Sequence, residues 1–424
     1  MTLQEKDKKY IWHPFTAYQE EDPLLITSAE GVYLHTHDGR KIIDAISSWW
    51  VNLHGHSNPV IAKAIAHQAS KLEHVIFAGF THEPAILLAE NLLSILPKNQ
   101  SKIFLSDDGS TAVEVALKMA IQYWHNQNIT NKTRVIAIEG SYHGDTFGSM
   151  SVGARDIFIT PFNKYLFEVD FIDFPYQEKE TEVIDDFKKL VKKGDVGVFI
   201  FEPLVQGATG MRIYRAELLD ELISIAHQHN VICIADEVFT GFCRTGKYFA
   251  SDHLNNQPDI IALSKGVTGG ILPLGVTSCS EKVEKVFQDS SSSKTFYHGH
   301  SYTGNPLACA AANASFSLLT NQDCQDRIHL ISSRFINFVA SIKKNISVKS
   351  VQSLGTILSI EMVTPENTAY QNPLRKEIYN YFLTKNILLR PLGNIIYVVP
   401  PYTISNLELD EVLSEIEMFI RSRA

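Results

Sequence analysis

The sequence is poor in cysteine and has no long apolar segment. Its five cysteines are widely spaced and form no C-x-x-C pair, which argues against a disulfide framework and against a zinc knuckle. They are Cys233, Cys243, Cys279, Cys309 and Cys324. No apolar stretch reaches the length of a membrane span, and the N-terminal stretch MTLQEKDKKYIWHP lacks an apolar core. We therefore expect a protein of the reducing cytoplasm with no membrane partner.

Positive charge is also in short supply. The chain has 38 lysine and arginine residues against 47 aspartate and glutamate residues, and its formal net charge is -9. No basic block exceeds a few positions, so the electrostatic footprint of a nucleic-acid-binding protein is missing. The expected partners are small molecules.

Three common ligand motifs are missing as well. No G-x-G-x-x-G follows an expected strand, which leaves a dinucleotide fold without support. The segment GFCRTGKY ends in Tyr248, where a phosphate-binding P-loop requires a serine or threonine hydroxyl for magnesium. The His-x-His pairs lack a third ligand at a recognisable spacing, so we expect no metal. These pairs are His35/His37, His54/His56 and His298/His300.

The pattern that is present indicates an α/β fold. From about residue 100 to 280, short apolar runs alternate with amphipathic helical patterns, which is typical of a mostly parallel sheet covered by helices. The strand-like runs are KIFL, RVIAIEG, VGVFIFEP, VICIADE, DIIALSK and LGVTSCS. At 424 residues the chain exceeds the usual size of one domain. We expect a large domain over residues 56–314 and a smaller α+β domain built from both chain ends, 1–55 and 315–424.

Unusual residues occupy the ends of three expected strands. VICIADE ends in Asp236-Glu237, DIIALSK ends in Lys265, and the run KIFLSDDGSTAVEVALKMA passes from strand through a glycine turn into a helix. In an open α/β sheet, ligands bind outside the carboxyl ends of the strands. An acid, an amine and a helix N-terminus are therefore expected at one crevice.

Each of these features has an ordinary structural explanation when taken alone. Thr111 and Glu114 have the spacing of a capping box, Asp236 and Glu237 can be solvated loop carboxylates, and Lys265 can form an ion pair with either of them. Their combination favours pyridoxal 5'-phosphate. Its aldehyde condenses with a lysine, its pyridine nitrogen needs an acidic partner, and its phosphate suits a helix N-terminus. The sequence thus predicts that Lys265 forms a Schiff base with this cofactor.

The same segments resemble a known family. ADEVFTGFCRTG followed by SKGVTGG is similar to the class III aminotransferases of fold type I, and the resemblance covers nearly the full chain. Five further segments resemble the branch that aminates 8-amino-7-oxononanoate (7-keto-8-aminopelargonate) to 7,8-diaminopelargonate in biotin synthesis. They are IWHPFT, SSWWVNLHGH, GDTFGSMSV, HGHSYTGNPLACAAANAS and LLRPLGNIIYVVPPY. The resemblance implies a homodimer with active sites at the subunit interface.

The resemblance assigns roles to the cofactor residues. It implies that Lys265 is the catalytic residue, which holds the cofactor and moves the proton, and that Asp236 keeps the pyridine nitrogen protonated. Tyr142 is expected against the ring and next to the substrate. The phosphate contacts are expected from Gly109 and Ser110, and from Ser301 of the other subunit with the neighbouring His300.

The substrate residues follow from the same resemblance. Trp49 and Trp50 are expected to wall the pocket around the apolar chain of the acceptor, and Arg390 to pair with its distal carboxylate. Phe15 and Gly299 complete this set, together with Tyr142 and Lys265. From the residues alone, the two tryptophans can equally be core aromatics and Arg390 a surface charge.

Three positions depart from the family pattern. Phe15 stands where HPYT has a tyrosine, so its hydroxyl is lost, and HGHSY replaces the family's HGPTF with His300 and Ser301. Ser301 retains a hydroxyl for the phosphate. Glu202 matches a class residue that can pair with an arginine, and Arg244 is expected to pair with a carboxylate.

The amino donor and two other functions stay open at this point. S-adenosylmethionine is the expected donor, and lysine is the alternative because a lysine-using branch tends to carry phenylalanine at the position of Phe15. The chain can also be an aminotransferase of ornithine or 4-aminobutyrate type, or a regulatory module that binds pyridoxal phosphate without turnover.

Overall fold

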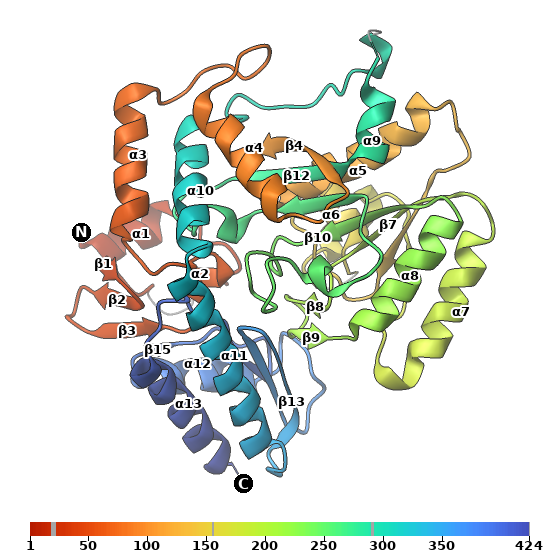
Figure 1. Cartoon of the computed structure of the whole chain (residues 1–424). Helices are drawn as coiled ribbons and strands as arrows, with labels where there is room; N and C mark the ends of the chain where they lie inside the picture. Colours follow the sequence, from red (N-terminus) through yellow and green to blue (C-terminus); the bar gives the residue numbers. More distant parts are fainter. Residues whose placement is uncertain (18–22, 155–156, 290–291, 424) are drawn as a thin grey trace.

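The central sheet of the protein has seven strands (Figure 1). The computed structural model describes residues 1–17, 23–154, 157–289 and 292–423. The strands are, in sheet order, β4 (Gln100–Ser106), β12 (Gly275–Ser280), β11 (Ile260–Leu263), β10 (Ile232–Asp236), β7 (Val196–Phe201), β5 (Arg134–Ile138) and β6 (Asp170–Ile172). β12 runs antiparallel to β11 and β4, and the strands from β11 to β6 are parallel to one another. The predicted mostly parallel sheet is confirmed.

All six predicted strand runs lie in this sheet, and β6 is the one that sequence patterning missed. β6 has three residues, too few to show a strand period. The parallel strands are apolar along their whole length because helices cover both faces. Ile232 and Ile234 of β10 pack in the cluster that contains α5 (Gly109–Asn126), whereas Cys233 and Ala235 pack in the cluster that contains α7 (Glu180–Val191) and α8 (Ala216–Gln228).

The carboxyl ends of three strands meet at one edge of the sheet. Asp236 at the end of β10 is level with Ala262 of β11, and β11 leads directly to Lys265. β4 runs in the same direction as β11, because both are antiparallel to β12. Since β4 leads into α5, the N-terminus of this helix lies at the same edge.

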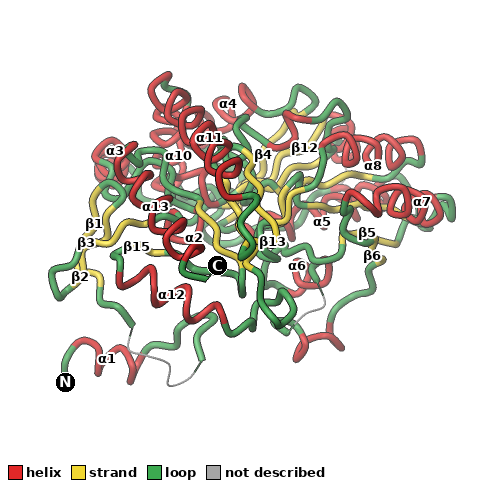
Figure 2. The backbone as a smooth tube through the Cα atoms, turned by 90° about the horizontal axis from the view of Figure 1, so that it is seen from below, coloured by secondary structure: helices red, strands yellow, loops and turns green. Residues whose placement is uncertain are grey.

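Strand pairing joins the two ends of the chain. β1 (Ile26–Glu30), β2 (Tyr33–Thr36), β3 (Lys41–Asp44) and β15 (Ile387–Leu388) form one sheet, in which β3 and β15 are parallel. Figure 2 shows these strands grouped together, away from β4 and β12 of the large sheet. The domain limits of 56–314 and of 1–55 with 315–424 stay a prediction.

The remaining elements complete the two ends and the connections. β13 (Val348–Leu354), β14 (Ile357–Met362) and β16 (Ile395–Val398) form a three-stranded sheet, and β8 (Val205–Gln206) pairs with β9 (Arg212–Ile213). The other helices are α1 (Leu3–Tyr10), α2 (Ser47–Trp50), α3 (Pro59–Lys71), α4 (Glu83–Ile95), α6 (Phe147–Val152), α9 (Glu281–Glu284), α10 (Pro306–Leu319), α11 (Gln322–Ile342), α12 (Leu374–Thr384) and α13 (Asn406–Arg421). Within the described ranges, none of these helices has the length and apolar character needed to span a bilayer.

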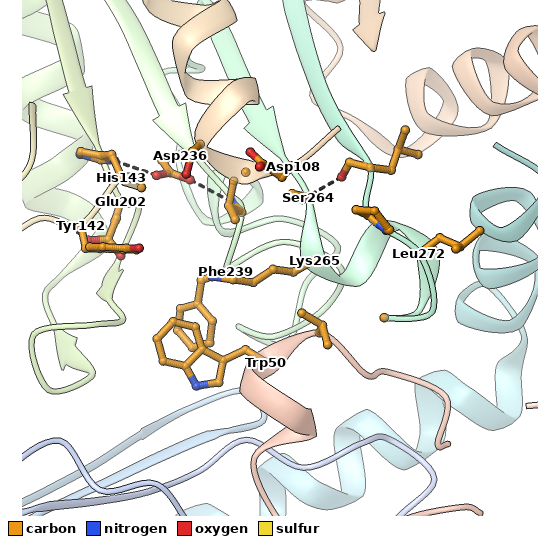
Figure 3. Close-up of a pocket in the computed structure, with 18 of the residues that line it drawn as sticks. Trp50, Asp108, Tyr142, His143, Glu202, Asp236, Phe239, Ser264, Lys265 and Leu272 are labelled. Atoms are coloured by element: carbon orange, nitrogen blue, oxygen red, sulfur yellow. Dashed lines mark hydrogen bonds and ion pairs between the residues drawn. The ribbon is translucent and has the colours of Figure 1, made fainter. Parts of the chain in front are cut away.

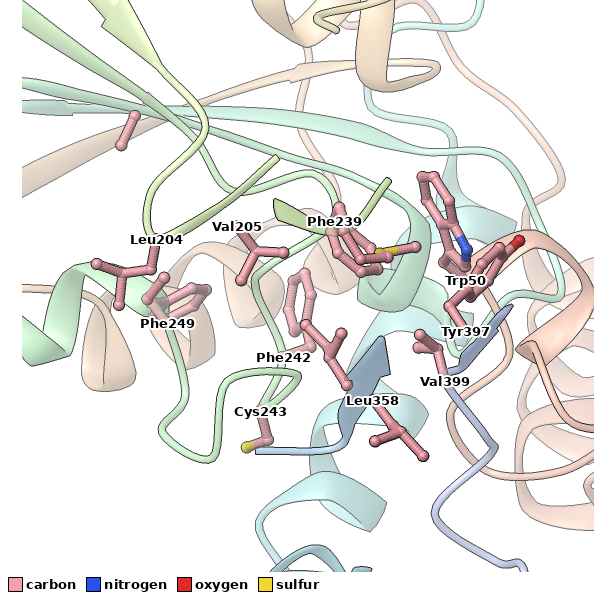
Figure 4. Close-up of a cluster of buried hydrophobic side chains, with 14 of the residues drawn as sticks. Trp50, Leu204, Val205, Phe239, Phe242, Cys243, Phe249, Leu358, Tyr397 and Val399 are labelled. Atoms are coloured by element: carbon pink, nitrogen blue, oxygen red, sulfur yellow. The ribbon is translucent and has the colours of Figure 1, made fainter. Parts of the chain in front are cut away.

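An apolar cluster holds the terminal segments against the large sheet (Figure 4). Trp50 from the N-terminal part packs on Phe239, with ring centroids 4.6 Å apart, and on Tyr397 of β16, at 6.1 Å. Phe242 and Leu358 belong to the same buried cluster. This packing fixes α2 relative to the strand ends, which is where the cavity described below opens.

Candidate active site

A cavity of about 430 Å³ opens at the carboxyl ends of β10 and β11, beside the N-terminus of α5 (Figure 3). Many of the predicted site residues line it. They are Trp50, Gly109, Ser110, Tyr142, Asp236 and Lys265, and Glu202 lines it as well. Tertiary structure therefore brings together residues that are more than 200 positions apart in the sequence.

Lys265 lies between acidic and aromatic groups. It follows β11 in a left-handed backbone conformation, with φ 45°, which is uncommon for a residue other than glycine. Its Nζ is 4.5 Å from the centroid of the Trp50 ring and 5.7 Å from that of Phe239 (Figure 3). Burial lowers the pKa of Lys265 to about 8, although the nearby Asp236 and Glu202 carboxylates act in the opposite direction. The uncharged, nucleophilic form of this amine is therefore far more populated near neutral pH than that of an exposed lysine.

Asp236 forms a buried pair with His143, which sequence reasoning missed. His143 Nδ1 lies 2.7 Å from Asp236 Oδ2, and the main-chain N–H of Val238 donates to Asp236 Oδ1 at 3.1 Å. Both side chains of the pair are almost fully shielded from solvent. The one sequence signal for His143 was its position directly after Tyr142, in a loop that follows β5. The pair holds the aspartate in a fixed orientation.

Glu202 is a buried carboxyl that accepts hydrogen bonds from the main chain. Its two oxygens accept from the N–H of Tyr142 and the N–H of Gly207, each at 2.9 Å. Burial raises the pKa of Glu202 to about 7, against the opposing effect of His143. No arginine in the described part of the chain hydrogen-bonds to Glu202, whose carboxyl instead fixes the Tyr142 loop.

The N-terminus of α5 forms a cradle suited to an anion. Asp108 caps the helix by accepting from the N–H of Thr111 at 2.8 Å, so the capping box lies one turn earlier than the Thr111 and Glu114 pair. Glycine is required close by, because a Cβ on Gly109 would lie 2.7 Å from a methyl group of Val238 and one on Gly144 would lie 2.2 Å from Ser110 Oγ. Helix N-termini with such close backbone approach bind phosphate.

Three of the predicted substrate residues, Phe15, Trp49 and Arg390, form a cluster of their own and do not line the cavity, although Trp49 directly precedes the lining residue Trp50. Trp49 is 37% exposed, and its ring lies 5.4 Å from that of Phe15. The guanidinium of Arg390 lies 4.6 Å from the centroid of the Trp49 ring. Trp50 is at once a core residue and part of the cavity wall, whereas Trp49 is not a core aromatic.

The backbone of α2 turns in the left-handed sense. The φ angles of Ser47, Ser48, Trp49 and Trp50 are 52°, 44°, 72° and 73°. Such a conformation costs roughly 1–2 kcal/mol for each residue with a Cβ. No glycine in the segment signals this turn, so the sequence patterning did not predict it.

Gly299, His300 and Ser301 lie away from the cavity of their own chain. They belong to the loop that precedes α10, where the N–H of His300 donates to Thr303 Oγ1 at 3.0 Å. His300 Nε2 is 3.7 Å from a carboxylate oxygen of Asp107. None of the three lines the cavity.

The expectation that Arg244 pairs with a carboxylate is wrong. Its guanidinium is fully buried and donates to the main-chain carbonyls of Pro400 at 2.8 Å, Trp50 at 3.2 Å and Asn52 at 3.4 Å. It also lies 5.0 Å from the centroid of the Tyr402 ring. These partners are far apart in sequence, so no local pattern could have predicted them.

One set of side chains in the described part of the chain has metal-compatible ligand atoms close together: His227, Cys233 and Asp259. Asp259 already accepts from Lys282 Nζ at 3.0 Å and from the N–H of Cys233 at 2.9 Å. Burial raises the pKa of the Cys233 thiol well above its usual value, which disfavours the thiolate that a metal needs. The cluster is explained by its own hydrogen bonds.

The lysine, the buried acid and the helix N-terminus on an α/β sheet are the features expected of a pyridoxal-phosphate-dependent enzyme. Residues 16–420 match the family model described as aminotransferase class-III, and the chain belongs to this family. Among its relatives, the adenosylmethionine-8-amino-7-oxononanoate aminotransferase of Synechococcus elongatus is 45% identical, over 96% of this chain and 97% of the relative. The Staphylococcus aureus protein of the same name is 36% identical, over 96% and 94%.

Solved structures agree with this assignment. The adenosylmethionine-8-amino-7-oxononanoate aminotransferase of Methanocaldococcus jannaschii superposes with a TM-score of 0.93 at 37% identity, covering 99% of this chain and 98% of the other. An amine transaminase from an uncultivated Pseudomonas species, solved in its PLP-bound form, superposes with a TM-score of 0.90 at 28% identity, covering 96% and 97%. The expected fold type I architecture is confirmed.

The cofactor of this enzyme is pyridoxal 5'-phosphate, and the residues of the cavity fit it. Lys265 offers an amine with a lowered pKa, Asp236 offers a fixed carboxylate, and α5 offers N–H groups for a phosphate. When bound, the cofactor supplies a ring that accepts the electrons released as a proton leaves the substrate carbon.

Replacing Lys265 with methionine should abolish transamination, by at least about 10³-fold, because no other amine replaces its nucleophile and base. Borohydride reduction of the wild-type enzyme, followed by peptide mass spectrometry, should locate the cofactor on Lys265. The matched control is Lys132→Met. Burial also lowers the pKa of Lys132, yet its Nζ donates to the carbonyls of Val196 and His229. Label on another lysine of the wild-type enzyme would refute the assignment.

Glu202 should give the protein a measurable pH dependence. Its folded-state pKa of about 7 exceeds the ordinary 4.5, so the folded protein keeps a proton that the unfolded chain releases. The resulting stabilisation is present below pH 4.5 and is lost as the pH rises to about 7. Relative to Glu202→Gln, the wild-type free energy of unfolding should therefore fall by up to about 3 kcal/mol across this window.

Urea denaturation at fixed protein concentration measures this difference. Glu366→Gln, which changes an exposed glutamate, is the control and should follow the wild-type curve. Parallel curves for wild type and Glu202→Gln between pH 4.5 and 8 would show that this carboxyl does not hold the extra proton.

Proposed function

We propose that the protein transfers an amino group from S-adenosylmethionine to 8-amino-7-oxononanoate, forming 7,8-diaminopelargonate. The relatives that carry this activity in their names align over nearly the whole chain. The observation that carries the proposal is the stacking of Arg390 on Trp49 next to the Trp50 wall of the cavity. An apolar wall that ends in a cation suits an extended carbon chain with a terminal carboxylate.

The residues of the cavity divide the chemistry among them. Lys265 Nζ would hold the cofactor. As a free amine it would take the proton from the substrate carbon and deliver it to the cofactor carbon to which Lys265 had been bonded. Asp236, oriented by His143, pairs with the pyridine nitrogen. Tyr142 lies over the site, where its hydroxyl donates to Asp145 Oδ2 at 2.9 Å and is thereby held in place.

The phosphate site extends to a second subunit in this proposal. Gly109 and Ser110 bind the phosphate from one chain, and Ser301 and His300 reach it from the partner, with Gly299 at the substrate side. Two observations support a homodimer. Gly299, His300 and Ser301 do not line the cavity of their own chain, and large apolar side chains are exposed on the same chain. They include Tyr10, Trp12, Ile76, Phe80, Ile86, Tyr297 and Tyr302.

The donor side of the site is aromatic. Phe15 lies 5.4 Å from Trp49 and 5.8 Å from Phe158, with edge-to-face geometry in both pairs. A sulfonium is a cation that such ring faces attract. Phe15 cannot donate the hydrogen bond that a tyrosine would, which is worth only about 0.5–1.5 kcal/mol. This loss is too small to exclude S-adenosylmethionine, and lysine is the competing donor.

The cytoplasm is the proposed location. All five cysteines are free and four of them are buried, as suits a reducing compartment.

Arg390→Ala should weaken the acceptor and spare the donor. Removing the charged partner of a bound carboxylate costs roughly 2 kcal/mol or more of binding free energy. The value of kcat/KM for 8-amino-7-oxononanoate should therefore fall at least about 30-fold. Arg423→Ala is the matched control, because Arg423 likewise lies over an aromatic ring, that of Phe419 at 5.0 Å, but this pair is at the end of α13 and not in the aromatic cluster of Phe15 and Trp49. Equal losses in the two half-reactions would rule out an acceptor-specific role for Arg390.

The donor is identified by the first half-reaction alone. The cofactor-loaded enzyme is mixed with each amine separately, and the conversion of the cofactor to its pyridoxamine form is followed by absorbance. We expect conversion by S-adenosylmethionine and none by low-millimolar lysine, ornithine or 4-aminobutyrate. Phe15→Tyr should tighten the donor by about two- to tenfold through one added hydrogen bond. Conversion by lysine alone would replace the donor and leave the acceptor assignment intact.

A further inference from the structure

The left-handed turn of α2 is the least expected part of the site. Four consecutive residues with a Cβ, Ser47 to Trp50, have positive φ angles. L-residues avoid this region because the Cβ approaches the following carbonyl oxygen, and a run of such residues persists only where the surroundings impose it. The groups that impose it therefore determine where the two tryptophans point.

Asp44 is the group on the N-terminal side of the turn. It is the last residue of β3 and is fully buried. Its Oδ1 accepts from the N–H of Ile46 at 3.2 Å and from the N–H of Ser48 at 3.0 Å, and its Oδ2 accepts from Ser48 Oγ at 2.7 Å. Three hydrogen bonds accepted by one carboxylate thus hold the first half of the turn.

The same carboxylate also reaches the chain that follows the turn. Asp44 Oδ2 lies 2.9 Å from His56 Nε2, and His56 Nδ1 lies 3.2 Å from Asn52 Nδ2. Because an amide nitrogen only donates, His56 Nδ1 is the acceptor there and Nε2 carries the hydrogen that is donated to Asp44. Both oxygens of Asp44 are therefore engaged, and Oδ2 joins Ser48 in the turn to His56 beyond it.

Arg244 holds the C-terminal side. It donates to the carbonyls of Trp50 and Asn52, and at 2.8 Å to that of Pro400. Ser47 Oγ donates to the carbonyl of Val399 at 2.8 Å. The turn is consequently fixed to the C-terminal segment that follows β16, and not only to its own neighbours.

The register of β3 and β15 ties this turn to the arginine of the site. Asp44 is level with Leu388 of β15, and the N–H of Ala45 donates to the carbonyl of Leu388 at 3.3 Å. Arg390 follows two residues later. The turn then places the Trp49 ring against Arg390 and the Trp50 ring 4.5 Å from Lys265 Nζ.

We propose that Asp44 is a positioning residue for the amino acceptor: by imposing the left-handed turn, it sets Trp49 against Arg390 and Trp50 against Lys265. The proposal rests on the function proposed above. Asp44 touches neither the cavity nor the cofactor site, so it acts through the two tryptophans. A purely structural role would lower stability and both half-reactions together, whereas a positioning role changes the acceptor half-reaction selectively.

The test is Asp44→Asn in the cofactor-loaded enzyme. The amide keeps the shape and can accept the two main-chain N–H groups, but its nitrogen cannot accept from Ser48 Oγ or His56 Nε2. We expect KM for 8-amino-7-oxononanoate to rise about tenfold, a change of about 1.4 kcal/mol. The rise in KM for the donor should be smaller, because in this proposal the donor shares the Trp49 ring but not the pair with Arg390. Ser48→Ala removes one of the same bonds at a less buried position and should raise KM about threefold.

Asp259→Asn is the matched control. Asp259 is likewise a buried carboxylate that accepts a main-chain N–H and lies near a histidine, but its partners, Cys233, His227 and Lys282, are not part of the Ser47–Trp50 turn. Its amide variant should change stability without a selective effect on acceptor KM. Equal losses in both half-reactions of Asp44→Asn, or an unchanged KM in both Asp44→Asn and Ser48→Ala, would overturn the proposal.

A second readout does not depend on activity. In a Trp12→Phe background, which removes a 95% exposed tryptophan, acrylamide quenching reports on Trp49, Trp50 and the buried Trp124. Asp44→Asn should increase the quenching constant by about half or more, and Asp259→Asn should leave it unchanged. No change in Asp44→Asn would refute the positioning role. If the wild-type enzyme fails to aminate 8-amino-7-oxononanoate, the proposed function fails, and quenching still decides whether Asp44 holds the turn.

Discussion

The site depends on burying one amine, that of Lys265, away from water and next to acidic and aromatic side chains. Burial lowers the pKa of Lys265, and the two buried acids, Asp236 and Glu202, keep it from falling further. The Trp50 ring packs against the Lys265 ammonium group in a cation-π contact. A lysine in this balance is poised to exchange a proton near neutral pH, which is the property that amino-group transfer requires.

The sheet places these side chains at the site without leaving buried main-chain N–H and C=O groups unpaired. The parallel strands satisfy their hydrogen bonds with one another, so the residues at their carboxyl ends are free to face a ligand. Asp236 and Lys265 occupy two adjacent strand ends, and the helix that begins at Gly109 opens beside them. The acid, the amine and the anion site thus have fixed separations, because the sheet and helix backbones that carry them are rigid.

The acceptor side is built differently, from a strained turn rather than from strand ends. Ser47 to Trp50 adopt a conformation that their side chains disfavour, and buried polar groups, Asp44 and Arg244, compensate with hydrogen bonds. Such groups require partners, since a buried and unpaired charge is costly. The turn and its anchors therefore form one unit, and the aromatic wall has the rigidity of the core on which it rests.

The sequence by itself determined the central sheet and the residues at its strand ends. An apolar run of strand length indicates a buried strand from the local sequence alone. Lys265, Asp236 and Gly109 directly follow or closely adjoin such runs. Because the strands that carry them run in the same direction, the three residues meet at one edge of the sheet. Tertiary structure alone decided the rest. The pairing of His143 with Asp236, the carbonyl partners of Arg244 and the handedness of the turn at Trp49 all depend on contacts between distant segments. These contacts leave no pattern in the local sequence. They become favourable only when folding brings the distant partners together and removes water from both.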